Sequence, residues 1–140
     1  MGMQGGITGL YTVLVDADDF NEPISDAVRG ILDGHVILSR ALATQNHFPA
    51  IDVLQSVSRV ASLIQAPEPL ASAGVLRERM ATWQEHRDII TLGAYATGAD
   101  PGIDKAIALK PDLDAFLRQG KHDQTPFAET MARMSQLAAR

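Results

Sequence analysis

The residue whose setting most suggests chemistry is Arg59, in the stretch PAIDVLQSVSRVASLIQ at residues 49–65. It is a single cation in a run dominated by Val, Leu, Ile, Ala and Ser. Two interpretations are open: Arg59 is a surface residue on an amphipathic turn, or its guanidinium is held ready for an anion from outside the segment. Arginine suits the second role because its planar fork makes bidentate contacts and keeps its charge.

A second group of polar residues lies in the loop DADDFNEP, at residues 16–23. Its acids resemble the start of a calcium-binding loop, but Asn21 stands where that loop requires Gly, and Ala27 where it requires Glu. We therefore expect no calcium site. The segment is either a solvated acidic turn or a loop that presents carboxylates and Asn21 to a basic or polar partner.

Two further kinds of site are not supported by the spacing of the residues. The histidines are scattered and the chain has no cysteine, so we predict no metal site. A P-loop needs Ser or Thr after its Gly-Lys pair, whereas His122 follows Gly120-Lys121. The sequence therefore has no P-loop to hold nucleotide phosphates.

Composition narrows the class of protein. The chain has 140 residues, about one domain, with a net charge of −5 and no basic stripe for nucleic acid. No apolar run reaches the length of a membrane span, and the start MGMQGG lacks the features of a signal peptide. We expect a cytoplasmic protein.

The first half of the chain reads as a piece of an α/β domain. Residues 7–15 are apolar and β-branched, which predicts a strand buried on both faces. A short helix over 26–32 and a strand over 35–38 follow, and Ser39 is a plausible N-cap for the next helix. We expect residues 47–53 to be irregular. A helix over 54–64 would turn Arg59 partly away from its apolar face.

The second half has the pattern of a small helical bundle. The two prolines of APEP, at residues 66–69, mark a linker, and apolar residues at helical spacing follow it, with Trp83 and the methionines expected in the core. Prolines indicate the helix boundaries: a start at Asp100-Pro101, an end at Lys110-Pro111 and a last start at Thr125-Pro126.

Three stretches carry a resemblance to a known family. They are residues 5–43, the stretch HFPAIDVLQSVSRV at 47–60, and RDIITLGAYATGADPGIDKAIALKPDLDAFL at 87–117. Together they resemble the C-terminal part of the flagellar and type III secretion export ATPases, which are similar to the catalytic subunits of rotary ATP synthases. The resemblance implies an α/β fold. Residues 1–66 would be the C-terminal segment of a RecA-like P-loop nucleotide-binding domain, with one or two strands plus helices, and 70–140 an all-α helical bundle.

The resemblance also implies roles for particular residues. Arg59 matches the arginine finger that reaches the γ-phosphate bound by the neighbouring subunit. Phe48 stands where relatives carry an aromatic residue, commonly Tyr, against the adenine ring. The loop that contacts the central coiled-coil stalk matches four residues: Asp18, Asp19, Asn21 and Glu22.

The function implied is that of a flagellum-specific protein export ATPase. The full-length enzyme would use ATP and Mg²⁺ as a homohexamer, with a central-stalk protein and export chaperone or substrate complexes as partners. It would be cytoplasmic and peripheral to the inner-membrane export apparatus. Because the P-loop is missing, this chain alone would bind no cofactor and be inactive. The alternatives are a non-catalytic protein-interaction module and a fragment of a rotary ATP synthase subunit.

Overall fold

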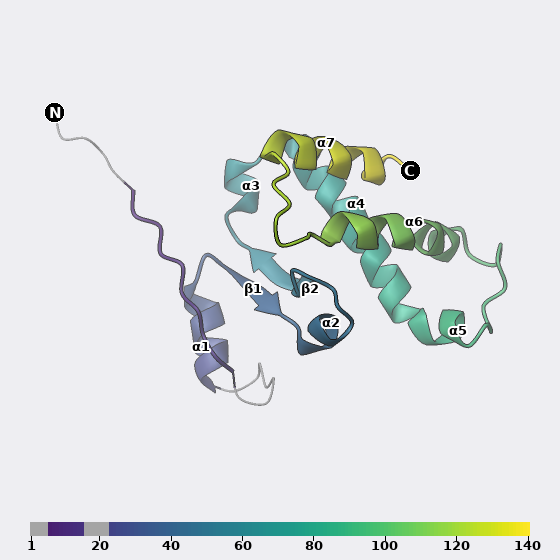
Figure 1. Cartoon of the computed structure of the whole chain (residues 1–140), viewed down its shortest axis with the longest axis horizontal. Helices are drawn as coiled ribbons and strands as arrows, with labels where there is room; N and C mark the ends of the chain where they lie inside the picture. The colour runs from purple at the N-terminus through teal and green to yellow at the C-terminus, as the bar shows by residue number, and fades with distance from the viewer. Residues whose placement is uncertain (1–5, 16–22) are drawn as a thin grey trace. The chain divides into compact units, whose positions relative to one another are not determined.

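The structure, a computed structural model, describes residues 6–15 and 23–140 and divides into two units (Figure 1). The first unit ends at Leu32 and contains the segment 6–15 and one helix. The second unit, Asp33–Arg140, holds two strands and the other described helices. In chain order the elements are α1 (Pro23–Ile31), β1 (Gly34–Leu38), α2 (Arg40–Thr44), β2 (Ile51–Ser58), α3 (Ala61–Ile64), α4 (Pro67–Glu85), α5 (Arg87–Thr91), α6 (Pro101–Leu117) and α7 (Phe127–Ala138).

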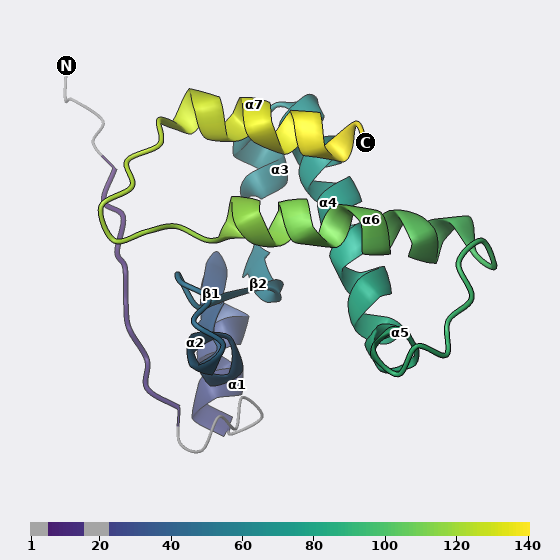
Figure 2. The ribbon, with the colours of Figure 1, turned by 45° about the vertical axis from the view of Figure 1, so that its right-hand side comes forward.

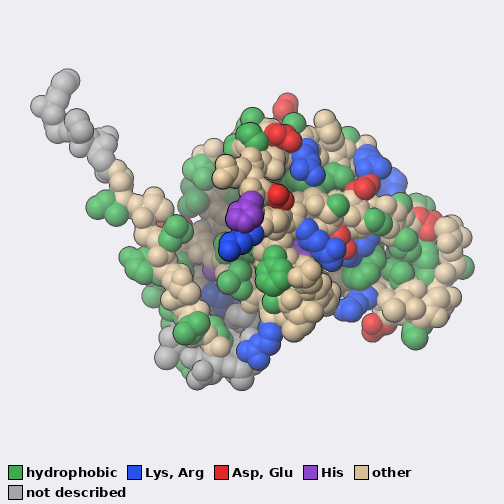
Figure 3. All heavy atoms as spheres, viewed as in Figure 1, with side chains coloured by type: hydrophobic (Ala, Val, Ile, Leu, Met, Phe, Trp, Pro, Cys, Tyr) green, Lys and Arg blue, Asp and Glu red, His purple; other side chains and the backbone are tan. Residues whose placement is uncertain are grey.

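The buried strand expected at residues 7–15 is wrong. Residues 6–15 form no strand, and their apolar side chains other than Val15 are exposed, Ile7 and Leu10 almost completely. Figure 3 shows hydrophobic side chains standing out along this segment. A strand needs a neighbour with which to exchange backbone hydrogen bonds. Within the described residues the two strands are β1 and β2, and they pair with each other. The apolar, β-branched composition of residues 7–15 favours a strand, but no described strand pairs with this segment.

The other local expectations for the first half are mixed. The strand over 35–38 is confirmed as β1, and Ser39 is confirmed as the N-cap of α2, since its hydroxyl accepts from the amide of Leu42. The helix over 54–64 and the irregular segment over 47–53 are wrong where β2 runs from Ile51 to Ser58. Its Ile and Val residues favour a strand once β1 offers a pairing edge.

The sheet consists of β1 and β2 in antiparallel pairing. The partners run from Gly34 opposite Ser58 to Leu38 opposite Ile51, with a register shift between His35 and Ile37. Gly34 is required at its end of the sheet because a Cβ there would lie 2.6 Å from the carbonyl oxygen of Val57. The two backbones therefore approach more closely than any side chain allows.

The helical bundle is built from α4, α6 and α7. In both ribbon views α4 crosses α6 and α7, which lie side by side (Figures 1 and 2). The core contains Leu76, Leu109 and Leu113, and Met80, Met134 and Leu137 pack against it. The expectation that methionines fill this core is confirmed for these two, as Met adapts to irregular gaps between helices.

Two of the proline-based boundaries are wrong. Residues 67–69 form the first turn of α4, where proline's missing N–H is not needed, so the linker is not observed. The helix α6 begins at Pro101 after the Asp100 N-cap, as expected, but continues through Pro111 to Leu117. An internal proline costs about 3 kcal/mol, and Leu109 and Leu113, buried on either side of it, offset that cost at about 1.5–3 kcal/mol each. The division into domains at 66–70 stays a prediction.

His47 is a buried polar side chain at the junction of the α2–β2 loop with α6. Burial lowers its pKa below the ordinary 6.5, and the charges of Arg118 and Lys110 act in the same direction, while Asp114 opposes them. The folded chain therefore holds the neutral imidazole to lower pH than the unfolded chain does.

The bundle core can be tested by Leu113→Ala. Leu113 is 2% exposed, so the variant leaves a cavity and should lower the free energy of unfolding by about 2–5 kcal/mol. Leu92→Ala is the matched control, because Leu92 is 81% exposed and should change stability by less than about 0.5 kcal/mol. Urea denaturation followed by circular dichroism measures both, and equal effects would contradict the assigned core.

The lowered pKa of His47 predicts a pH dependence of stability. Between pH 6.5 and the lower pKa of the folded state, the unfolded chain binds the proton and the folded chain does not, so stability falls as the pH falls. His47→Gln should reduce the change in the urea midpoint between pH 7 and pH 5. The control His122→Gln, at an exposed histidine, should keep the wild-type slope, and a slope unchanged in both variants would contradict the assignment.

Candidate functional site

Arg59 lies immediately after the last residue of β2, and its side chain is exposed. Its backbone N–H donates to the carbonyl oxygen of Asp33, at 2.7 Å, just before β1 begins. The guanidinium thus extends from a backbone position that the sheet fixes. Of the two interpretations of Arg59, a residue at the surface and a charge aimed outward, this position is compatible with both.

Phe48 lies in the loop between α2 and β2 and is 51% exposed. Its carbonyl oxygen accepts from the backbone N–H of Gln119, at 2.8 Å, which ties the loop to the residues that follow α6. The ring lines an open depression together with Arg118, Lys121 and Asp123. A half-exposed ring beside two cations is suited to stacking on a planar, negatively charged ligand.

The structure does not bring Arg59 and Phe48 together. One follows β2 and the other precedes it, and the four steps of β1 from Gly34 to Leu38 that pair with β2 correspond to about 14 Å of strand. The two side chains therefore do not form one compact cluster. The remaining predicted site residues, Asp18, Asp19, Asn21 and Glu22, lie outside the described residues.

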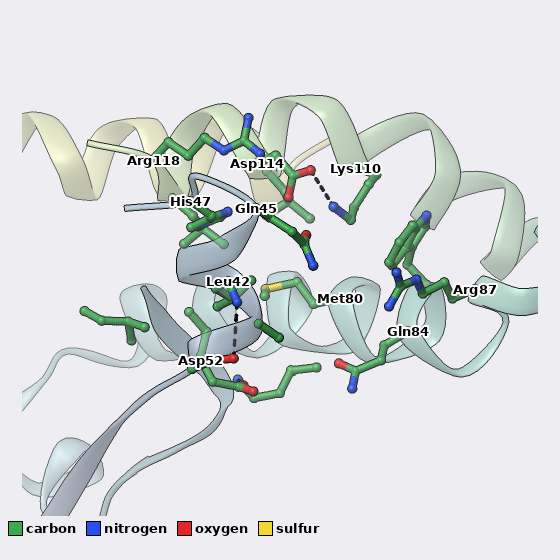
Figure 4. Close-up of a pocket in the computed structure, with 18 residues that line it drawn as sticks. Leu42, Gln45, His47, Asp52, Met80, Gln84, Arg87, Lys110, Asp114 and Arg118 are labelled. Carbon is green, nitrogen blue, oxygen red and sulfur yellow. Dashed lines mark hydrogen bonds and ion pairs between the residues drawn. The ribbon is translucent and has the colours of Figure 1, made fainter. Parts of the chain in front are cut away.

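A second hollow, of about 280 Å³, lies where α2 and β2 meet α4 and α6 (Figure 4). His47 reaches it from the loop that carries Phe48. Lys110 ion-pairs with Asp114 on α6, and its ammonium lies 4.4 Å from the centre of the Trp83 ring. The charged contacts at this hollow lie within the bundle, along α6 and between α6 and α4.

Sequence reasoning missed three cations near these sites. Arg118 and Lys121 line the depression at Phe48, and Arg77 on α4 donates to backbone carbonyl oxygens of β2. In the sequence the Gly120-Lys121 pair suggests only a P-loop, which His122 excludes, so its place beside Phe48 is not predicted. Arg77 had no signal, because nothing in the spacing of α4 indicates that a strand lies beside it.

Over residues 6–15 and 23–140 the structure shows no cluster of His, Asp and Glu that could hold a metal ion. None of the helices in these ranges is both long and apolar enough to cross a membrane. Chemically, the described residues can contact an anion at Arg59 and a planar ring at Phe48.

Two family profiles match the sequence and together span most of it. The profile of the T3SS EscN ATPase C-terminal domain matches residues 65–136, and that of the ATP synthase alpha/beta family nucleotide-binding domain matches residues 1–58.

Curated relatives are similar over nearly the whole chain. The chain is 49% identical to the flagellum-specific ATP synthases of Treponema pallidum and Bacillus subtilis, over 95% of its own length and 30% of theirs. It is 45% identical to the type 3 secretion system ATPase of Sinorhizobium fredii, over 99% of its length and 31% of the relative. The chain thus spans about 30% of the length of these relatives.

Solved structures agree with this likeness. The assembled ATPase EscN from the type III secretion system of enteropathogenic Escherichia coli superposes with a TM-score of 0.87 at 39% identity, over 91% of this chain and 31% of EscN. The ATP synthase subunit NeqB of Nanoarchaeum equitans shares the fold, with a TM-score of 0.77 at 21% identity, over 89% of this chain and 33% of NeqB. With the EscN C-terminal domain profile over just over half of its residues, the chain belongs to the type III secretion ATPase family, which is related to the alpha and beta subunits of ATP synthases.

Proposed function

We propose that this chain contributes the C-terminal part of a flagellum-specific protein export ATPase. Two of the relatives at 49% identity are named flagellum-specific and support the flagellar assignment, while a third at 49% is the SPI-2 type 3 secretion system ATPase of Salmonella typhimurium. The assembled state of EscN supports self-association, which we propose takes the form of a hexamer. The reaction is ATP hydrolysis, coupled to the unfolding and export of flagellar proteins. The enzyme is cytoplasmic and peripheral to the inner-membrane export apparatus.

The observation that carries this proposal is the similarity to flagellum-specific and type 3 secretion ATPases over nearly the whole chain, and within the proposal Arg59 is the residue that we assign to catalysis. Its side chain is exposed directly after a strand, while its amide is fixed to Asp33. An arginine held in this way can contact the γ-phosphate of a nucleotide bound by the neighbouring subunit. Its two-pronged charge then stabilises the negative charge that develops on the transferring phosphoryl group.

Phe48 supplies the second contact. Its half-exposed ring, at the far end of β2 from Arg59, stacks on the adenine of a nucleotide, with Arg118 and Lys121 beside it. In this proposal the two residues serve two different nucleotides, because Arg59 acts on the nucleotide of the neighbouring subunit and Phe48 on that of its own subunit. One chain therefore takes part in two neighbouring sites of the ring.

ATP and magnesium fit this chain only in part. When bound, they supply the phosphoryl group and the counter-charge for its transfer. The chain's own residues fit the adenine at Phe48 and the γ-phosphate at Arg59. The sequence has no P-loop, and the described residues include no metal cluster. The phosphates and the metal are held by other residues of the assembled enzyme.

Partner contacts follow the same reasoning. The structure of EscN with its central stalk EscO supports a stalk partner for this chain as well. We assign that contact to Asp18, Asp19, Asn21 and Glu22, which carry carboxylates and an amide that basic or polar stalk residues can bind. Export chaperones and their substrates are the remaining partners.

Arg59→Ala in the full-length ATPase tests the finger. Removing the guanidinium should lower kcat by about 10³–10⁵-fold and leave the KM for ATP within a few-fold, because the finger acts on the transition state. Phosphate release measures both constants. Arg140→Ala, which removes another exposed guanidinium, is the control and should keep wild-type kcat. Turnover near wild type in Arg59→Ala would overturn the assignment.

Phe48→Ala should give the opposite kinetic signature. Loss of stacking, worth about 1–3 kcal/mol, should raise the KM for ATP about 5- to 150-fold and change kcat little. Phe48→Tyr keeps the ring and should remain within about threefold of wild type in both constants. If Phe48→Ala bound ATP normally, the adenine would lie elsewhere.

A further inference from the structure

The strand that carries Arg59 is interrupted by a large bulge. His35 pairs with Val57 and Ile37 pairs with Asp52, so a single residue of β1 faces residues 53–56 of β2. Such an insertion bends a strand and leaves backbone groups without ladder partners. The direction in which β2 leaves the bulge sets the position of Arg59.

One side of the bulge is held by Asp52. Its carboxylate accepts from the backbone amides of Leu54 and Gln55, at 3.0 Å each, and from the side-chain amide of Gln55, at 2.7 Å. The hydroxyl of Ser56 donates to the carbonyl oxygen of Asp52 and accepts from the amide of Ile37, at 3.0 Å. These contacts satisfy the backbone N–H groups of Leu54 and Gln55 but none of the carbonyl oxygens of residues 53–56.

The carbonyl side is held by Arg77, which reaches across from α4. Its guanidinium donates to the carbonyl oxygens of Val53, of Leu54, at 3.0 Å, and of Ser56, at 3.3 Å. One planar fork thus binds three oxygens of four consecutive residues. A lysine ammonium is a point charge and does not match this planar arrangement of acceptors.

We propose that Arg77 is a positioning residue for Arg59, an inference that rests on the proposed function of Arg59 as the finger. Arg77 contacts no nucleotide in this role. By fixing the bulge it sets the course of Val57 and Ser58, and through them the backbone from which the finger extends. It also links the helical domain to the catalytic strand, because the same helix, α4, packs in the bundle core through Leu76.

Steady-state kinetics of the full-length ATPase tests the role. Arg77→Ala should lower kcat about 10- to 100-fold, the order expected for a displacement near 1 Å, with the KM for ATP within about threefold. Arg77→Lys, which keeps the charge, should restore only part of the loss and carries the test if the alanine variant does not fold. Arg79→Ala, two residues further along α4, is the control and should keep wild-type kcat.

The double variant with Arg59→Ala separates positioning from general weakening. If Arg77 acts through Arg59, Arg59→Ala/Arg77→Ala should be as slow as Arg59→Ala alone, within about twofold. A further 10- to 100-fold loss would overturn the proposal, as would wild-type kcat in both Arg77 variants.

Amide hydrogen exchange of the 140-residue chain tests, independently of catalysis, whether Arg77 stabilises the backbone at Arg59. The amide of Arg59, bonded to Asp33, should exchange at least about tenfold faster in Arg77→Ala, while that of Leu113 in α6 keeps its rate. An unchanged rate at Arg59, or equal acceleration at both amides, would overturn the role of Arg77. By contrast, full turnover in Arg59→Ala would overturn the finger and leave this exchange result standing.

Discussion

The conformation of this chain around its candidate site depends on one constraint, the need to satisfy the backbone of the bulge in β2. Residues 53–56 have a single residue of β1 opposite them, and all of them except Gln55 are partly buried, so their backbone groups need partners other than a full strand ladder. Asp52 binds the amides of Leu54 and Gln55, and Arg77 binds the carbonyl oxygens of three of these four residues. The carboxylate of Asp52, from the strand itself, and the guanidinium of Arg77, from helix α4, thus supply hydrogen bonds that β1 does not supply at the bulge.

This arrangement joins two parts that the family profiles treat as separate domains. Helix α4 packs on α6 and α7 through Leu76, and the next residue, Arg77, holds the strand. The strand in turn carries Phe48 before its first residue and Arg59 after its last. A displacement of α4 would therefore be transmitted to the backbone that precedes Arg59 through the contacts of Arg77. Under the proposed role of Arg59 as the finger, the bundle would have a physical means of influencing a neighbouring subunit's active site.

The sequence predicted the elements whose signals are local. The N-caps at Ser39 and Asp100 were visible because a capping side chain acts within three residues, and the bundle core because its leucines follow a helical period. Features set by distant partners were missed. The helix considered over 54–64 is replaced by β2 up to Ser58 because the pairing with β1 is not encoded locally. The helix end expected at Pro111 is wrong because the burial of residues on both sides of it depends on tertiary packing. The candidate site residues were predicted from the family resemblance, whereas the contact of Arg77 with β2 is seen only in the structure.

The central claim is that one chain serves two nucleotides from opposite ends of β2. An experimental structure of the assembled full-length ATPase with magnesium and a non-hydrolysable ATP analogue tests it most directly. The account predicts the ring of Phe48 against the adenine of one analogue, and the guanidinium of Arg59 within about 3 Å of the γ-phosphate of another, bound by the neighbouring subunit. Both side chains on the same nucleotide, or Arg59 directed into solvent in every subunit, would contradict it.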